Sequence, residues 1–208
     1  MNEIRIMMFI PGIIGGRVEQ FLINCVKYFP ETYKVTIIYQ HEPNQVFLDK
    51  FHEVGCETIR IASKKENPLQ NFWQSYKLIK KIKPHIVHSH MNQFSFIPLM
   101  MAQISNIKVR IAHSHISERG EEGLSKIINH LGITLTNIFC NYRISCGTEA
   151  SYYLFKNSDS TIIKNGINIQ KFRFNQGSRD EIRDNLGIAD NIVLGNVGRL
   201  TNQKNQIG

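Results

Sequence analysis

Short apolar runs alternate with amphipathic stretches along most of the chain. Residues 4–10 form a nearly continuous apolar run of strand length, and Pro11 and Gly12 follow it. From Val18 to Phe29 the apolar positions instead recur every three or four residues, which predicts a helix. By the same criteria we expect strands at 4–10, 35–39, 58–62, 86–89, 109–112, 143–146 and 161–163. Helices are expected at 18–29, 46–54, 68–82, 96–104, 124–139 and 148–155.

This regular alternation determines the expected fold class. Strands separated by helices are joined by right-handed crossovers, which build a mostly parallel sheet with helices on both faces. A chain of 208 residues is long enough for one large domain of this kind and the edge of another. The sequence therefore predicts an α/β protein with a Rossmann-like, doubly wound sheet.

The pattern changes after Asn165 and Gly166. Residues 178–181 have capping-box spacing for a short helix, which Gly187 is placed to end. Residues 192–197 form another apolar strand pattern, and a polar segment follows it. We expect this to be the truncated start of a second Rossmann-like domain. The predicted organisation is a Rossmann-like domain at 1–165, a linker with a short helix at 166–190, and the first strand and turn of an incomplete second domain at 191–208.

Composition and charge narrow the function only slightly. Apolar residues make up 42% of the chain and the net charge is +8, with a sequence pI near 9.4. A basic balance favours nucleotide phosphates, nucleic acid or an acidic membrane surface as partners, or it reflects a generally basic surface. The cysteines form no CxxC pair, and the apolar N-terminal stretch is too short for a signal or membrane-spanning segment. These features predict a cytoplasmic protein with free, buried thiols.

The first candidate site is the glycine-rich loop that follows the first predicted strand. Glycines let the backbone approach a ligand, and the next helix offers its N-terminal N–H groups to a phosphate. The spacing of Gly12, Gly15 and Gly16 differs from the dinucleotide fingerprint GxGxxG, and Glu42 is displaced from the position of its acidic residue. A tight strand–helix turn without a ligand is the alternative.

The second candidate site consists of histidines at the ends of two strands. Alternate residues of a strand point to the same face, so His88 pairs with His90 and His113 with His115. Neither a carboxylate nor a cysteine shares these loops, and we therefore expect no metal. Contacts to sugar hydroxyls and phosphate fit these residues better. For His85 and His88 an alternative is a core position satisfied by the backbone.

Taken together, the motifs resemble family 4 of the retaining glycosyltransferases, which have two Rossmann-like domains (the GT-B type). Within this family the chain is most similar to bacterial capsule and exopolysaccharide enzymes. The resemblance runs in order across nearly the whole chain. Its most specific part is Asn165-Gly166 followed further on by Val197-Gly198-Arg199-Leu200 and Gln203-Lys204-Asn205. The other motifs that carry it are Gly15-Gly16-x-x-Glu19, Ile86-Val87-His88-Ser89-His90, Arg110-Ile111-Ala112-His113-Ser114-His115 and Ile144-Ser145-Cys146-Gly147-Thr148-Glu149.

The resemblance implies roles for individual residues. Gly15 and Gly16 would face the diphosphate of a nucleotide-sugar donor across the cleft. A histidine, either His113 or His115, would lie near the acceptor and the transferring sugar, and the resemblance does not choose between them. Among the substrate-binding residues it also implies His90 and Asn165.

Two cations would hold the leaving group in the resembled family. Arg199 would bind the diphosphate as a bidentate fork and Lys204 as a point charge. Fixed positive charge stabilises a departing phosphate, so no metal or other cofactor is required. The family's second-domain Glu-x7-Glu motif is not found in this sequence, so no carboxylate nucleophile or acid is assigned.

The resemblance thus implies a glycosyltransferase that moves a sugar from a nucleotide-sugar donor to a glycan or lipid-linked acceptor in bacterial polysaccharide biosynthesis. The expected partners are the donor, the acceptor and, by peripheral contact, the inner face of the plasma membrane; nucleic acid is not expected. As given, the chain is expected to be incomplete and inactive. The alternatives are a non-catalytic fragment that binds an acceptor or a partner, and a nucleotide-sugar epimerase of the same architecture.

Overall fold

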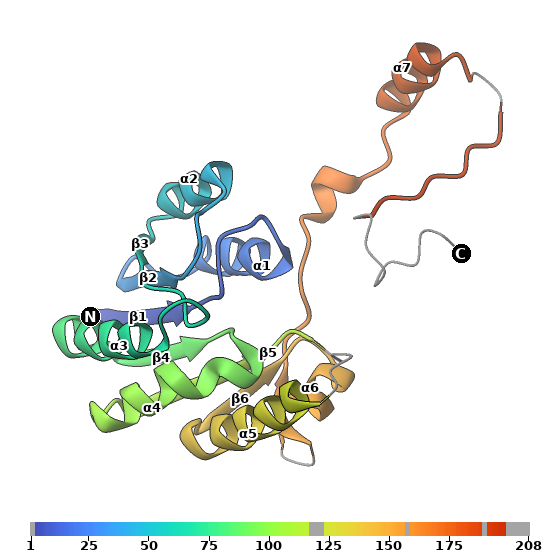
Figure 1. Ribbon diagram of the computed structural model, residues 1–208. Coiled ribbons are helices and arrows are strands. Elements are labelled where there is room, and N and C mark those ends of the chain that lie inside the picture. Colours follow the sequence, from blue (N-terminus) through green and yellow to red (C-terminus); the bar gives the residue numbers. More distant parts are fainter. Residues whose placement is uncertain (1–2, 117–122, 157–158, 189–190, 199–208) are drawn as a thin grey trace. The chain divides into compact units, whose positions relative to one another are not determined.

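The computed structural model describes residues 3–116, 123–156, 159–188 and 191–198. Its contacts divide the chain into a larger unit that ends at Ile167 and a smaller unit that begins at Asn168. The larger unit is a seven-stranded sheet with helices on both faces (Figure 1). This architecture confirms the predicted α/β fold class.

Every pairing in the sheet is parallel. The strands lie in the order β3-β2-β1-β4-β5-β6-β7, so β1 is an interior strand beside the middle strand β4. Along the chain, β1 to β3 extend the sheet toward one side, and β4 to β7 extend it toward the other. The topological switch point, where this direction reverses, therefore falls between β1 and β4. All carboxyl ends share one edge of the sheet, where such folds bind ligands. The strands are β1 (Ile4–Phe9), β2 (Tyr33–Tyr39), β3 (Glu57–Arg60), β4 (Ile86–Ser89), β5 (Val109–Ser114), β6 (Tyr142–Ser145) and β7 (Thr161–Ile162).

The helices form two layers, one on each face of the sheet. Two of them, α1 and α2, pack on one face, whereas α3 to α6 cover the other (Figure 1). The predicted helix periodicity is confirmed for each of them. Their bounds are α1 (Arg17–Val26), α2 (Gln45–Glu53), α3 (Pro68–Ile82), η1 (Asn92–Ser95), α4 (Phe96–Ile104), α5 (Leu124–Phe139) and α6 (Thr148–Phe155).

Alternation along β1 sends side chains into two separate cores. Met8 packs beneath α1 with Phe21 and Leu22, whereas Met7 and Phe9 pack beneath the opposite helix layer. All five side chains are at least nine-tenths buried. A strand buried on both faces has to be apolar at every position, which explains the continuous apolar run of its sequence.

The smaller unit has no core of its own among the residues described. It contains η2 (Ile169–Phe172) and α7 (Gln176–Leu186), and neither helix buries a side chain. Asn175, rather than Ser178, caps α7, since its side chain accepts a hydrogen bond from the Ser178 N–H at 2.9 Å; the predicted end at Gly187 is confirmed by its left-handed conformation. The domain boundaries at 165 and 190 stay a prediction.

One predicted element is absent from this unit. Residues 192–197 have the apolar pattern of a strand, but the structure assigns them no strand. Ile192, Leu194 and Val197 are each more than nine-tenths exposed. A strand is defined by its ladder of hydrogen bonds, and no described segment lies beside this one to complete the ladder. The prediction of a strand here was wrong.

The structure also bears on two further expectations, which concern membrane-spanning segments and the state of the cysteines. Among the described residues, no helix is long and apolar enough to cross a membrane. The four cysteines are free, as expected, but only Cys56 and Cys140 are buried, while Cys25 and Cys146 are partly accessible.

Candidate functional site

The glycine-rich loop leaves the carboxyl end of β1 and leads into α1. Gly15 has φ +81°, a left-handed conformation that other residues rarely adopt. A side-chain carbon at Gly15 would also lie 3.1 Å from the Phe47 ring of α2. Gly16 is the N-cap of α1, and a side-chain carbon there would lie 2.9 Å from a carboxyl oxygen of Glu19. The backbone conformation therefore favours glycine at Gly15, and a side chain at either position would crowd a neighbouring side chain.

Glu19 of α1 contacts this loop, a role that the sequence did not indicate. Its side chain is 4% exposed, and its carboxyl oxygen Oε1 accepts a hydrogen bond from the Ile14 N–H at 2.8 Å. The carboxyl group lies in the first turn of α1, where unpaired N–H groups and the helix dipole favour an acceptor. Glu19 thus fixes the shape of the loop and satisfies one of the N–H groups that a phosphate could otherwise bind.

The histidines of β4 and β5 come together at the same edge of the sheet. Both members of each pair lie on one face, because residues two apart in a strand point the same way. The register of β4 against β5 brings the two histidine pairs together. Ser89 lies opposite Ala112, so the residues that follow them, His90 and His113, lie side by side. Ring centroids of His88 and His90 are 4.1 Å apart, and those of His90 and His113 are 4.9 Å apart. We call His88, His90, His113 and His115 the histidine cluster.

Two ring-to-ring contacts connect the cluster across the strands. His90 Nδ1 lies 2.8 Å from His115 Nε2, and His113 Nδ1 lies 3.3 Å from His88 Nε2. Three further ring nitrogens are buried without a partner in the described part of the chain: His90 Nε2, His113 Nε2 and His115 Nδ1. Buried polar atoms are normally hydrogen-bonded, so unsatisfied ones are a reason to look for a ligand.

The environment keeps the cluster uncharged. Burial lowers the pKa of His88 from its ordinary value of 6.5 to about 3, with His115 adding a repulsive charge. Burial also lowers the pKa of His115 to about 4 and the pKa of His90 well below the ordinary value. The pKa of His113 is lowered by burial and by its histidine neighbours. A neutral imidazole has one N–H donor and one lone pair, so at neutral pH these rings can bind hydroxyl groups or a metal ion.

Neighbouring elements hold the cluster in place. Phe21 of α1 makes edge contacts with His113 and His115, at centroid distances of 5.3 and 5.9 Å. Asn92 is buried at the start of η1 with φ 50°, and its side-chain oxygen accepts a hydrogen bond from the His115 N–H at 2.9 Å. The His90 N–H donates to the Phe9 carbonyl at 2.8 Å, which connects the cluster to β1. Asn92 was not indicated by the sequence, although asparagine is the side chain that most readily adopts positive φ.

The other predicted site residues are placed less centrally. Asn165 is exposed on the segment that follows β7, and no side-chain hydrogen bond of Asn165 is found among the described residues. Arg199 and Lys204 lie outside the residues that the structure describes. His85 is held by the backbone, because its Nδ1 accepts a hydrogen bond from the Arg5 N–H at 3.0 Å. The expected backbone contact is thus found for His85, but this residue is exposed and the expectation of a core position was wrong; His88 contacts another histidine ring.

The loops of both candidate sites lie at the same edge of the sheet. The glycine loop follows β1, His90 follows β4 and His115 follows β5, and these three strands are consecutive in the sheet. Their parallel pairing puts all three loops at one edge, beside the switch point.

Comparison with known proteins assigns the chain to a family. A family model described as "Glycosyl transferase 4-like" matches residues 14–118, which include the glycine loop and the histidine cluster. The chain belongs to this glycosyl transferase 4-like family. A relative from Bacillus subtilis (strain 168), described as putative glycosyltransferase EpsF, is 25% identical over 222 residues; the match covers 98% of this chain and 56% of that protein.

Solved structures show the same fold. The crystal structure of Anabaena Alr3699/HepE in complex with UDP superposes with a TM-score of 0.79 and 16% identity, covering 98% of this chain and 55% of the other. A putative UDP-N-acetylglucosamine 2-epimerase from Listeria monocytogenes superposes with a TM-score of 0.54 and 17% identity, covering 74% and 42%. The chain thus spans about half the length of the EpsF and HepE proteins.

Proposed function

We propose that this chain is the acceptor-side half of a retaining glycosyltransferase. The enzyme transfers a sugar from a nucleotide-sugar donor to a glycan or lipid-linked acceptor in bacterial polysaccharide biosynthesis. The observation that carries the proposal is the meeting of the glycine loop and the histidine cluster at one edge of the sheet, in a member of the glycosyl transferase 4-like family. The complexes of the HepE structures with UDP and UDP-glucose support this donor class, and the relative described as putative glycosyltransferase EpsF supports sugar transfer.

The proposed reaction assigns separate tasks to the two sides of the site. The bond between the anomeric carbon and the oxygen of the donor phosphate breaks, and a bond from that carbon to an acceptor oxygen forms. The nucleoside diphosphate leaves with the electron pair of the broken bond and takes up the proton that the acceptor hydroxyl loses. His115 or His113 binds at the acceptor and the transferring sugar, and neutral imidazole suits a hydroxyl partner because it both donates and accepts hydrogen bonds.

The donor phosphates are proposed to meet the chain at other residues. The N–H groups of Gly15 and Gly16 face the diphosphate, while Glu19 holds the loop open in the required shape. Arg199 and Lys204 stabilise the charge that builds on the leaving diphosphate. His90 and Asn165 complete the proposed set of substrate-binding residues.

Sugar-transfer assays test this proposal directly. The assay compares the 208-residue chain with a protein in which the same residues are joined to a complete donor-binding domain, using radiolabelled UDP-sugars and a membrane extract as acceptor. We expect no transfer by the shorter protein and transfer by the longer one. In the longer protein, Arg199→Ala or Lys204→Ala should lower the rate by about two orders of magnitude, as for loss of one donor at a developing anion. Robust transfer by the 208-residue chain alone would overturn the assignment of the two halves.

An epimerase is the second candidate, since solved 2-epimerases share the fold. An epimerase converts a nucleotide sugar with no acceptor present. A transferase consumes its donor only slowly by hydrolysis under these conditions. Incubating the longer protein with a nucleotide sugar alone, and following the sugar by NMR, therefore distinguishes the two activities.

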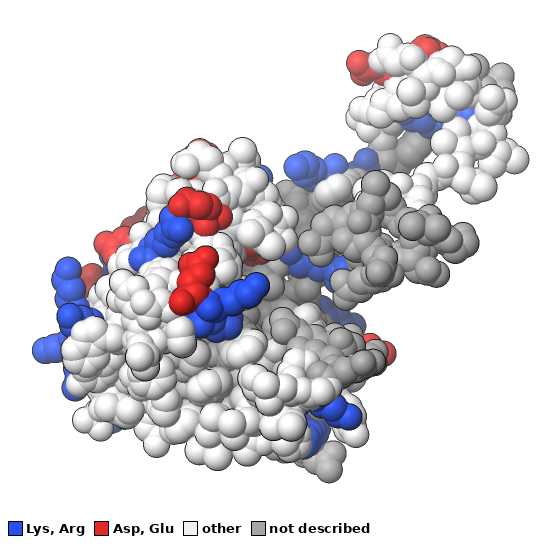
Figure 2. Space-filling view, in the orientation of Figure 1, with Lys and Arg blue, Asp and Glu red and all other residues white. Residues whose placement is uncertain are grey.

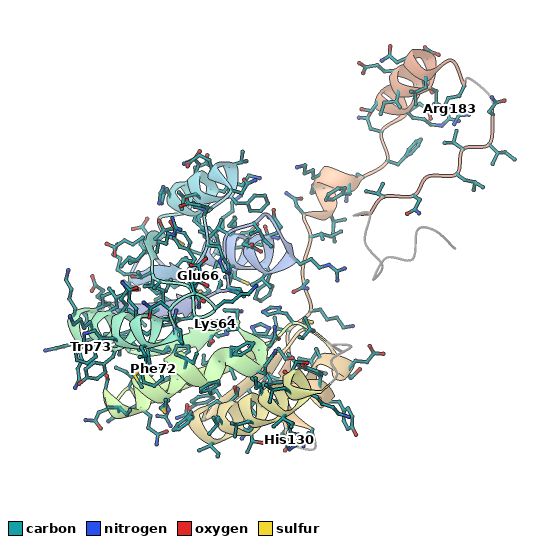
Figure 3. All side chains as sticks on the ribbon, in the orientation of Figure 1. Lys64, Glu66, Phe72, Trp73, His130 and Arg183 are labelled. Carbon is teal, nitrogen blue, oxygen red and sulfur yellow. The ribbon has the colours of Figure 1, made fainter. Side chains whose placement is uncertain are left out.

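A surface feature supports the proposed contact with the inner face of the plasma membrane. The outer side of α5 carries apolar side chains that are at least half exposed, spaced as one helical stripe: Leu124, Ile127, Leu131 and Ile138. Figure 2 shows few charged side chains over α4 and α5. On α3, in the same helix layer, Trp73 is 56% exposed and Lys77 lies over its ring (Figure 3). Exposed apolar stripes with nearby lysines fit an anionic lipid surface.

Vesicle flotation tests the membrane contact. The chain should float with anionic vesicles at low salt and less so at high salt, because each lysine near the surface contributes about 1 kcal/mol that salt screens. Ile127→Asn with Leu131→Asn should reduce recovery, whereas His130→Asn on the same helix should not. Equal recovery with neutral and anionic vesicles would contradict the electrostatic part.

A further inference from the structure

The histidine cluster has the ligand set of a metal site. His88, His90 and His113 can each direct one ring nitrogen so that the three nitrogens lie within 4.8 Å of one another. The three residues come from two neighbouring strands, and backbone pairing fixes the strands beneath them. Three histidines are by themselves a sufficient protein ligand set for zinc, with no carboxylate or thiolate needed.

An unpartnered nitrogen points to a missing ligand. His90 Nε2 is buried and has no hydrogen-bond partner in the described part of the chain. The His90 side chain is 1% exposed, so solvent does not replace a partner. Leaving such atoms unsatisfied costs stability, and coordination of a cation removes that cost for any nitrogen with a free lone pair.

The spacing of the rings fits a small ion. Nitrogen ligands lie about 2.0–2.1 Å from zinc, so two of them in tetrahedral geometry are about 3.4 Å apart. His113 Nδ1 and His88 Nε2 already lie 3.3 Å apart, longer than the 2.8 Å between His90 Nδ1 and His115 Nε2. The first distance suits two ligands of one ion, whereas the second is an ordinary hydrogen bond.

The remaining histidine completes the arrangement as a positioning residue. When His90 Nδ1 donates its hydrogen to His115 Nε2, the lone pair of His90 is left on Nε2, the buried and unpartnered atom. Metal-bound histidines usually donate their other ring N–H in this way, which fixes the tautomer and the ring orientation. His115 is itself held through its backbone N–H by Asn92.

We propose that His88, His90 and His113 bind one divalent transition-metal ion, zinc above all, and that His115 orients His90. Three protein ligands leave a fourth position for an oxygen ligand such as water, a hydroxyl or a phosphate. Neutral imidazole suits zinc and its neighbours in the series, while magnesium and calcium prefer oxygen ligands. Because the rings are already uncharged at neutral pH, no proton has to be displaced. The inference does not depend on the proposed sugar transfer.

Cobalt substitution and zinc calorimetry test the site on the full 208-residue chain, prepared without a histidine tag and freed of metal with chelator. We expect one equivalent of Co²⁺ to give the visible absorption of a four-coordinate complex, and one equivalent of Zn²⁺ to displace it. We also expect zinc to raise the melting temperature of the wild-type chain. An absorption spectrum of octahedral, hydrated Co²⁺ only, or no saturable zinc binding, overturns the proposal.

Substitutions locate the ion. His88→Asn, His90→Asn and His113→Asn should each abolish the cobalt spectrum, and His115→Asn should weaken zinc binding 10–100-fold, the range for residues that orient a metal ligand. The control is His130→Asn, an exposed histidine of α5 (Figure 3), which should bind as tightly as the wild type. Circular dichroism checks that each variant folds. A glutamine variant at the same position replaces any asparagine variant that does not fold. The cobalt spectrum of the wild-type chain tests the proposal independently of the variants. Unchanged binding by all three ligand variants contradicts the proposal.

Discussion

The two faces of β4 and β5 differ sharply in what they bury. On the face covered by α3 to α6, Val87 and Ala112 are fully buried in an apolar core. On the opposite face of the same strands, next to α1, lies the histidine cluster, in which His90 and His113 are buried and His88 and His115 are partly buried. Apolar burial stabilises the fold, whereas burying unpartnered polar atoms costs stability. One face of these strands is thus a packed apolar core, whereas the other holds polar ring nitrogens without a partner among the described residues.

We expect the largest change in the free energy of unfolding on acidification, which acts on the histidine face. Unfolded histidines take up a proton near pH 6.5, whereas folded His88 and His115 do so only near pH 3 and 4. Between these values the unfolded state binds more protons, so the free energy of unfolding falls as pH falls. Each such histidine contributes a slope of about 1.4 kcal/mol per pH unit. Urea denaturation with chelator, from neutral pH to about pH 5, measures the slope. A stability that does not change over this range would contradict the burial of the neutral rings.

Truncation on the apolar face should have the next largest effect. Leu99 of α4 is fully buried in the core beneath α3 to α6. Leu99→Ala should lower the free energy of unfolding by about 3 kcal/mol, through lost burial and the cavity left behind. Urea denaturation at neutral pH measures this loss, and the sugar-transfer activity of the longer protein should persist below its lowered melting temperature. A loss of less than about 1 kcal/mol would mean that this core is loosely packed.

The glycine loop should show a smaller effect with a matched control. Gly15→Ala should cost about 1–2 kcal/mol from its positive φ, plus a further term from the Phe47 ring at 3.1 Å. Gly55 has the same φ of +81°, but a side-chain carbon there would meet nothing within 4 Å. The difference between Gly15→Ala and Gly55→Ala in thermal unfolding therefore isolates the contact of the loop with α2. Equal losses would show that Phe47 moves aside.

Replacing a polar pair on the histidine face should have the smallest effect on stability. His90 and His115 contact each other through ring nitrogens 2.8 Å apart. When both partners of a buried hydrogen bond become apolar side chains of similar size, stability changes little or rises. We expect the double variant His90→Leu, His115→Leu to unfold within about 1 kcal/mol of the wild type in chelator, while losing zinc binding. A large destabilisation would mean that these histidines maintain the fold.

Much of the larger unit could be predicted from the sequence, because its signals are local. Apolar periodicity predicted each strand and α-helix of this unit but not the 3-10 helix η1, and period-2 spacing placed His88 with His90 on one face. The joining of the two histidine pairs could not be predicted, since it depends on the register of β4 against β5. The hydrogen bond from Ile14 to Glu19 depends likewise on the conformation of the loop.

In the smaller unit, the sequence pattern predicted a strand that the structure does not contain. Residues 192–197 have the same apolar character as β1, yet only β1 is a strand. The difference lies in their neighbours: β1 pairs with β2 and β4, while no described segment pairs with 192–197. Local pattern predicts which residues can form a strand, and long-range pairing decides whether they do.

Initial rates of sugar transfer test the central claim most directly. The claim is that the histidine face of the sheet is the acceptor side of a glycosyltransferase. The measurement compares His113→Asn, His115→Asn and the control His130→Asn in the protein that carries a complete donor-binding domain, with radiolabelled donor and saturating acceptor. We predict that at least one of the two cluster variants loses about two orders of magnitude in rate, while His130→Asn keeps the wild-type rate. Full activity of both cluster variants would contradict the account.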